Sequence, residues 1–349
     1  MYFASDNSGP ALPAVLQAMI DANAGYATSY GDDALMDEVR DRIRTLFEAP
    51  QASVYLVATG TAANALALAT LSQPWQTVFC TPLAHIHVDE CNAPEFFTGG
   101  AKLSLVGQAD KMTPDELRQA IAAWPKGDVH AAQHGPLALT QATERGRIYS
   151  CQEIAALCTV ARDHGLPTYM DGARFANAVA ALGCSPAEMT WKAGIDAVSM
   201  GGTKNGCLGV EAVIFFAPEN AWEFELRRKR SAHLFSKHRY LSAQMLGYLR
   251  DHLWLETAQE ANARAARLAT GLRSVPGARM VFERDVNMIF ASLPRATHQR
   301  LKTAGAVYFL YEGPLDTGPA DEPLLARFVC DWSITEAQIE AFLSVARGD

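Results

Sequence analysis

Two residue types that could form one reactive centre stand at the ends of short apolar segments. Lys204 lies in "GGTKNG" (201–206), where the flanking glycines leave room for another group to approach the lysine. A lysine amine condenses with carbonyl groups, although a solvent-facing charge in a glycine turn would give the same pattern. Asp171 follows the apolar stretch "PTYM" and is either a turn residue or a buried carboxylate that needs a cationic partner.

A lysine and an aspartate together match the needs of one cofactor. Pyridoxal 5'-phosphate uses a lysine amine for a Schiff base and a carboxylate that keeps its pyridine nitrogen protonated. The segment "ATGTAANAL" (58–66) predicts a strand end followed at once by a helix. Gly60 and the hydroxyls of Thr59 and Thr61 would then surround a helix N-terminus suited to phosphate, unless Thr59 is only a helix cap. The chain has neither G-x-G-x-x-G nor a P-loop motif to suggest a nucleotide instead.

Two histidines and one arginine stand where their side chains need an explanation. His85 and His87 in "LAHIHVDE" (83–90) would share a face if the segment is extended. They could end a polar strand, bind a metal or stack on a cofactor ring, but no third ligand is suitably spaced and we predict no metal site. Arg327 lies in the apolar segment "LLARFVCDW" (324–332), and its planar guanidinium would suit an amino-acid carboxylate.

The basic run "LRRKRSAHLFSKHRY" (226–240) contrasts with the rest of an acidic chain. It would form a solvated helix face, or contact a phosphate or a neighbouring subunit. The pI of about 5.6 and net charge of −8 argue against a nucleic acid or an anionic membrane as partner. A small soluble substrate fits better.

Strands and helices alternate up to about residue 217, which predicts a mostly parallel sheet covered by helices. Strands are expected at 54–59, 77–81, 136–141, 167–171, 195–200 and 210–217, and helices at 34–47, 62–72, 113–124 and 150–165. The last two helices begin with capping boxes, Thr113 with Glu116 and Ser150 with Glu153. In such sheets ligands bind beyond the carboxyl ends of the strands. Strand ends are predicted at Thr59, Thr81, Asp171 and the turn that carries Lys204.

The pattern changes after a long helical stretch at 239–272. Short strands are expected at 279–283, 287–293, 307–311 and 325–332, closed by a helix at 335–346. We therefore expect two domains, a large α/β domain at 1–240 with an N-terminal arm at 1–15, and a small α+β domain at 241–349.

Cysteine usage and hydropathy bear on the compartment. The seven cysteines form no C-x-x-C pair, and their odd number fits a reducing environment. No stretch has the roughly 18 apolar residues of a membrane span, and the first residues lack the pattern of a secretory signal. The expected location is the cytoplasm.

Taken together, these segments resemble the threonine aldolases of the fold type I pyridoxal-phosphate enzymes, within the β-eliminating lyase group. The resemblance runs nearly end to end and is carried by "SDNSG" (5–9), "YGDD" (30–33), "TGTAAN" (59–64), "AHIHVDE" (84–90), "APEFF" (93–97), "TQATE" (140–144), "MDGARFANA" (170–178), "TWKAGIDAVSMGGTKNG" (190–206) and "ARFVCDW" (326–332). "MDGAR" ahead of "GGTKNG" is the most specific of these, and "GGTKNG" resembles the low-specificity branch. The resemblance implies an aspartate-aminotransferase-like fold.

The resemblance also implies roles by position. Lys204 would carry the cofactor, Asp171 would bind its pyridine nitrogen, and His85 would stack on its ring and assist at the substrate hydroxyl. The other implied positions are Thr59, Gly60 and Thr61 for the phosphate, Ser5, Arg174 and Arg327 for the substrate carboxylate, and Tyr30 and Lys229 near the cofactor. Tyr30 and Lys229 could come from an adjacent subunit, since the family forms homodimers or homotetramers with shared sites.

One position departs from the family pattern. Many members have a histidine-asparagine-glycine turn where this chain reads "ATERG" (142–146), with Glu144 in the place of the histidine. That histidine helps to bind the β-hydroxyl of the substrate. Here the task could fall to His85, His87, Glu144 or water.

The implied activity is that of a pyridoxal-phosphate-dependent aldehyde-lyase. It would cleave an L-β-hydroxy-α-amino acid (L-threonine, L-allo-threonine or phenylserine) to glycine and an aldehyde. The same scaffold could support β-elimination, racemisation or decarboxylation, since fold does not fix the reaction. A non-catalytic binding protein that keeps the site is a further alternative.

Overall fold

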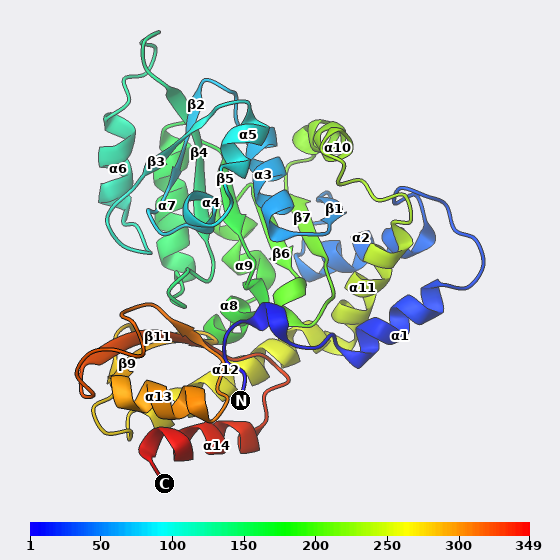
Figure 1. Cartoon of the computed structure of the whole chain (residues 1–349). Coiled ribbons are helices and arrows are strands. Elements are labelled where there is room, and N and C mark those ends of the chain that lie inside the picture. The colour runs from blue at the N-terminus through cyan, green and yellow to red at the C-terminus, as the bar shows by residue number, and fades with distance from the viewer.

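The computed structural model describes residues 1–349, apart from the side chain of residue 220, and contains two sheets (Figure 1). The larger sheet consists of β1 Ser53–Val57, β2 Gln76–Cys80, β3 Lys102–Leu105, β4 Gln133–Thr140, β5 Thr168–Asp171, β6 Ala197–Gly201 and β7 Glu211–Phe215. Its order is β1-β7-β6-β5-β4-β2-β3, and only β7 runs antiparallel to its neighbours. The sheet is mostly parallel, as predicted.

Fourteen α-helices accompany the sheets in the described residues. They are α1 Pro13–Ala22, α2 Ala34–Leu46, α3 Gly60–Leu71, α4 His85–Val88, α5 Ala93–Thr98, α6 Pro114–Ala122, α7 Cys151–Asp163, α8 Phe175–Leu182, α9 Pro186–Met189, α10 Ala221–Arg230, α11 Arg239–Leu249, α12 Leu253–Leu272, α13 Arg295–Thr303 and α14 Glu336–Arg347. The predicted capping boxes of α6 and α7 are both formed. None of the described helices combines the length and the apolarity that crossing a membrane requires.

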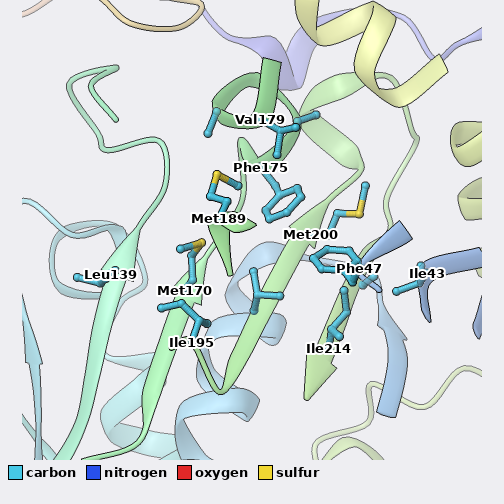
Figure 2. Packing of buried hydrophobic residues seen from close by; sticks show 14 of the residues in the cluster. Ile43, Phe47, Leu139, Met170, Phe175, Val179, Met189, Ile195, Met200 and Ile214 are labelled. Atoms are coloured by element: carbon cyan, nitrogen blue, oxygen red, sulfur yellow. The ribbon is translucent and has the colours of Figure 1, made fainter. Parts of the chain in front are cut away.

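The large sheet separates two apolar cores, and β7 contributes to both. Val213 and Phe215 pack with residues of α3 and α10, whereas Ala212 and Ile214 pack with residues of α2, α7, α8 and α11. This alternation follows from the period of two along a strand. In the second core the ring of Phe175 lies among the side chains of Met170, Met189 and Met200 (Figure 2). Both faces of the sheet are therefore covered, which holds the strand ends in place.

A four-stranded sheet lies in the C-terminal region, beside α13 and α14 (Figure 1). It contains β8 Arg279–Met280, β9 Met288–Pro294, β10 Phe309–Leu310 and β11 Pro323–Val329 in the order β10-β11-β9-β8. Trp254 and Ala258 of α12 belong to the core of the large sheet, whereas Ala265 and Leu268 belong to the core of the small one. Packing thus changes from one core to the other within α12, and the division at residue 240 stays a prediction.

The N-terminal segment contacts both regions. Tyr2 forms a bridge with Val307, and Phe3 donates its amide to the Val307 carbonyl (N–O 2.8 Å) and accepts from the Val329 amide (2.8 Å). Leu12 and Val15 then pack in the core of the large sheet. The intervening residues are held between the two regions, where the N-terminal chain is seen in Figure 1.

Three predicted elements differ from the structure. The helical stretch at 239–272 is broken at 250–252, because Asp251 and His252 adopt φ values of +50° and +60°. The strands predicted at 279–283 and 307–311 shorten to two residues each. The segment 83–90, whose conformation the sequence left open, forms the single helical turn α4.

Candidate active site

A cavity of about 360 Å³ lies where β1, β5 and β6 end and β7 begins. Six of its lining residues are predicted site residues: Thr59, Gly60, Thr61, His85, Asp171 and Lys204. Thr81, at another strand end, is buried and does not line it. A larger hollow of about 660 Å³ between α5 and α10 contains none of these six, so size alone does not identify the site.

Lys204 lies in a tight turn after β6, and the two residues that follow it, Asn205 and Gly206, are held in place by their contacts. Asn205 donates its side-chain amide to the Tyr248 hydroxyl (2.8 Å) and to the Trp254 carbonyl (2.7 Å). Gly206 has φ +109°, and a Cβ added there would lie 2.5 Å from the Leu12 side chain. Only glycine meets both conditions without strain. The turn therefore delivers the lysine amine to the cavity from a rigid base.

Asp171, the last residue of β5, is 5% exposed and is held by two donors. Its Oδ1 accepts from the Ala173 amide (3.0 Å), and its Oδ2 accepts from the side-chain amide of Asn64 (2.9 Å). These bonds fix the orientation of the carboxylate in the wall of the cavity. A cationic ring nitrogen in the cavity would provide the charged partner that a buried carboxylate needs.

The N-terminus of α3 forms another part of the wall. The Thr59 hydroxyl accepts from the Ala62 amide (3.2 Å), so it caps the helix as the alternative prediction had it. The amides of Gly60 and Thr61 have no acceptor among the described residues. A Cβ added at Gly60 would meet no atom within 4 Å, so the cavity is open above these amides. Free N–H groups at the positive end of a helix suit an anion such as a phosphate.

His85 is oriented by a buried carboxylate. Its Nδ1 donates to Oε1 of Glu90 (2.8 Å), and the same oxygen accepts from the side-chain amide of Asn64 (2.7 Å). The hydrogen bond to Glu90 raises the pKa of His85 more than burial lowers it, and the charges of Glu144 and Asp171 add to the rise. Asn64 also donates to Asp171, so its side-chain amide connects the carboxylate that holds His85 with the carboxylate at the end of β5.

The N-terminal segment contributes a buried ion pair next to the cavity. Asp6 accepts from Nε (2.7 Å) and Nη2 (3.0 Å) of Arg174, and both side chains are almost completely buried. Burial alone would raise the pKa of Asp6, but the charges of Arg174 and Lys204 and the hydrogen bonds of Arg174 and Asn287 hold it below its usual value. Arg174 is thus neutralised by the protein, which weakens its predicted role as a free carboxylate anchor.

Arg327 is in a different state from Arg174. Its Nη2 donates to the Ala4 carbonyl (3.3 Å), and its guanidinium lies 4.7 Å from the centre of the Phe309 ring. Its Nε is buried and has no partner among the described residues. No carboxylate of those residues pairs with it. Ser5 lies beside Ala4, and its hydroxyl accepts from the amide of Asn7, a residue that lines the cavity.

Four further predicted residues lie outside the cavity lining, as Ser5, Arg174 and Arg327 also do. His87 is exposed, because the turn of α4 sends residues two apart in different directions, and the shared face that an extended segment would give does not form. Tyr30 and Lys229 are exposed and contact one another, with Nζ 4.8 Å from the centre of the ring. Glu144 is half-buried and near His85 and Arg174, since its charge raises the pKa of both.

Sequence reasoning missed four residues that shape the site: Asp6, Asn64, Glu90 and Glu211. Each has a polar group buried in a segment that was quoted for other residues. Glu90 follows His85 by five positions and Glu211 begins an apolar strand, which are weak signals. Asp6 and Asn64 give none, because their partners are distant in the chain.

Comparisons with known proteins agree with this geometry. The family model described as "Beta-eliminating lyase" matches residues 2–295. The chain is 40% identical over 346 residues to a low specificity L-threonine aldolase of Pseudomonas aeruginosa, covering 99% of this chain and 96% of the relative. It is 39% identical over 338 residues to a protein of the same name from Pseudomonas sp. (strain NCIMB 10558), covering 97% and 94%.

Two solved structures extend the comparison. The threonine aldolase of Leishmania major superposes with a TM-score of 0.90 at 25% identity, covering 99% of this chain and 98% of that one. A variant of the serine palmitoyltransferase from S. paucimobilis with a bound pyridoxal phosphate–myriocin aldimine gives a TM-score of 0.68 at 17% identity, covering 100% of this chain and 86% of that one. The latter likeness concerns the fold alone. The resemblance and the fold type I class predicted from the motifs are confirmed.

Proposed function

The chain belongs to the beta-eliminating lyase family, and from that premise we propose that it cleaves an L-β-hydroxy-α-amino acid to glycine and an aldehyde. The observation that carries the proposal is one cavity lined by Lys204, Asp171 and the open N-terminus of α3. These supply the amine, the carboxylate and the anion site that pyridoxal 5'-phosphate requires. L-Threonine is the substrate named for the Pseudomonas relatives.

The residues present fit this cofactor. Lys204 would bind its aldehyde carbon, Asp171 its ring nitrogen, and the amides of Gly60 and Thr61 its phosphate, above which the cavity is open. When bound, the cofactor supplies an electron sink for the bond broken at the substrate Cα. The protein decides which bond that is by fixing the substrate.

Arg327 is the residue that we assign to the substrate carboxylate. Its guanidinium has a buried, unpartnered Nε and no carboxylate partner among the described residues. Arg174 instead bonds Asp6 with two of its nitrogens. Ser5 and Arg174 would then support the binding of the carboxylate indirectly, because both hold the N-terminal segment in place.

His85 is the residue that we assign to the β-hydroxyl proton. Its Nδ1 is occupied by Glu90, so the Nε2 is the nitrogen left for the substrate. The raised pKa makes the imidazole of His85 a stronger base for this proton. Glu144 contributes charge near His85, and His87 points to solvent.

The reaction is tested by products and by absorbance. With threonine and with phenylserine, the purified protein should form glycine and aldehyde in equal amounts and show a near-visible band of the bound cofactor. Lys204→Ala should lose the band and lower kcat by ~10⁴-fold or more. Lys192→Ala, a surface lysine paired with Glu48, is the control. A keto acid and ammonia in place of glycine and aldehyde would contradict the proposal.

We also propose a homodimer or homotetramer with shared sites. Tyr30 and Lys229, which the resemblance assigns to the cofactor, contact each other at the surface outside their own cavity. Co-expressed Lys204→Ala and Lys229→Ala chains should form mixed oligomers with activity that neither variant has alone. A fully active Lys229→Ala protein, or inactive mixed oligomers, would oppose shared sites.

The cytoplasm is the compartment that we propose. All seven cysteines are free, and four of them are buried (Cys80, Cys158, Cys207 and Cys330). Unpaired cysteines are typical of a reducing compartment. Fractionation of cells that produce the chain at its natural level tests this assignment.

A further inference from the structure

Glu211 is a buried carboxyl in the wall of the cavity that the reaction described above does not use. It is 6% exposed and is the first residue of β7. A carboxyl in such a position is costly unless its oxygens are bonded. The structure shows which groups bond it, and all of them belong to the lysine turn.

Strand register places Glu211 between the two halves of the cofactor site. It pairs with Val57 of β1 on one side and with Gly201 of β6 on the other. Two residues beyond Val57 the helix cap Thr59 begins the anion site, and three residues beyond Gly201 stands Lys204. Any movement of Glu211 would therefore shift both the anion site and Lys204.

Both carboxyl oxygens of Glu211 accept hydrogen bonds from the residues that precede the lysine. Oε2 accepts from the Gly202 amide (3.1 Å), and Oε1 accepts from the Thr203 hydroxyl (2.6 Å). The same hydroxyl accepts from the Val210 amide (3.2 Å), which closes the link back to β7. Gly202 cannot be replaced by a larger residue, since a Cβ there would lie 2.8 Å from the Val210 carbonyl. The turn is thus pulled tightly against the start of β7.

The surroundings of Glu211 are consistent with a carboxyl held for its position. Burial raises its pKa to about 7, although the Thr203 hydroxyl, the charge of Lys204 and the Gly202 amide lower it. Asp171 is the acidic group nearby that raises it further. The cost of keeping this carboxyl where it is suggests a use in the site.

Resting on the proposed function, we propose that Glu211 is a positioning residue for Lys204. Its carboxyl clamps Gly202 and Thr203 to β7 and thereby fixes the point from which the lysine amine enters the cavity. Displacing a reacting group by about 1 Å can lower a rate 10²-fold, so the clamp matters for kcat more than for substrate binding.

The chain offers a matched control at the opposite end of β6. Asp196 Oδ2 also accepts from a threonine hydroxyl (Thr168, 2.9 Å) and from a backbone amide (Thr168, 2.7 Å), but it does not line the cavity. Asp196→Asn therefore removes the same kind of carboxyl contact without touching the lysine turn. Both variants should lose some stability, and only one should disturb the site.

The test compares Glu211→Gln with Asp196→Asn in the cofactor-loaded protein. We expect Glu211→Gln to lower kcat by ~10–100-fold with KM within about threefold, and to weaken the visible circular dichroism of the bound cofactor relative to its absorbance. Asp196→Asn should leave kcat, KM and the dichroism within about twofold of the wild type. Equal kcat losses in both variants, or a Glu211→Gln protein with wild-type kcat and dichroism, would overturn the proposal.

A second measurement needs no cofactor and separates this inference from the proposed function. In the cofactor-free protein, the amides of residues 202–206 should exchange with deuterium ~10-fold faster in Glu211→Gln but not in Asp196→Asn. If Glu211→Gln does not fold, Thr203→Val and Thr203→Ser replace it, because only serine keeps the hydroxyl donor. Valine should speed exchange and lower kcat, and serine should not. If Glu211→Gln loses or alters the reaction but leaves the deuterium exchange of residues 202–206 unchanged, the proposal that Glu211 positions Lys204 is contradicted.

Discussion

The two sides of the cavity are built in different ways. On the strand-end side, Lys204, Asp171 and the start of α3 stand directly after neighbouring strands, so the order of the sheet brings them together. On the opposite side, Asp6 holds Arg174 and Asn287, which lie 168 and 281 residues away in the chain. The first side depends on sheet topology, and the second depends on one carboxylate and the segment that carries it.

The strand-end side therefore holds the groups assigned to the reaction, whereas the other side holds the groups assigned to anchoring the substrate. The strand-end groups have little freedom, because each is the end of a strand covered by helices on both faces of the sheet. The anchoring groups are held by charge, with one arginine already neutralised and the other, Arg327, left with an unpartnered nitrogen. Substitutions should therefore damage stability or substrate binding on the second side and rate on the first.

The largest stability effect is expected from Asp6→Asn. It leaves the buried Arg174 without its counter-ion, and we expect a loss of about 3–5 kcal/mol in the free energy of unfolding measured with urea. Because the folded pKa of Asp6 is lowered, the stabilisation that its carboxylate contributes to the wild type is present above the unfolded pKa and is lost as the pH falls through the lowered folded pKa. The variant should lack that acid-dependent loss. Asp37→Asn, in an exposed pair with Arg40, is the control and should change stability by less than about 1 kcal/mol.

Arg327→Gln should act on the substrate rather than on the fold. We expect KM for the amino acid to rise ~10–100-fold, because a charged hydrogen-bond pair with the carboxylate is lost. The exposed Arg279 of the same sheet supplies the control substitution Arg279→Gln, for which KM should not change. A wild-type KM in Arg327→Gln would mean that Arg174 is the true anchor and that the two sides are less distinct than proposed.

Glu90→Gln should move the pH dependence of the reaction. The hydrogen bond from His85 to Glu90 is the largest cause of the raised histidine pKa, and without it only the charges of Glu144 and Asp171 would oppose burial, which lowers the pKa. If His85 acts as a base, the acidic limb of kcat/KM should shift to lower pH by about one unit. Glu153→Gln, a carboxylate that bonds Lys111 outside the cavity, should leave the limb in place.

His87→Ala should have the smallest effect. Because His87 is exposed and outside the cavity, kcat and KM should stay within about twofold of the wild type, as for other surface changes. Steady-state kinetics with threonine tests this directly. A loss of tenfold or more would show that His87 takes part in the site of the working enzyme, as an extended segment 83–90 would allow.

The same difference decides what could be predicted from the sequence. Short apolar runs followed by glycine, threonine or aspartate locate the strand ends, so the parallel sheet and the residues Thr59, Asp171 and Lys204 were found. The place of His87 could not be decided, because four residues of alternating pattern cannot distinguish a strand from one helical turn. The pairing of Asp6 with Arg174 could not be predicted, because no sequence pattern near either residue indicates a partner 168 positions away.

The hydrogen bonds between Phe3 and the strands at Val307 and Val329 have a consequence for biosynthesis. Residue 3 is synthesised long before its partner at 329. At ~5–20 residues per second, the segment carrying Asp6 must wait roughly 15–70 s without its docking strand. The buried counter-ion of Arg174 can therefore take its final place only after β11 has been made, and a chain that stalls before β11 would carry the lysine and the aspartate but no finished site.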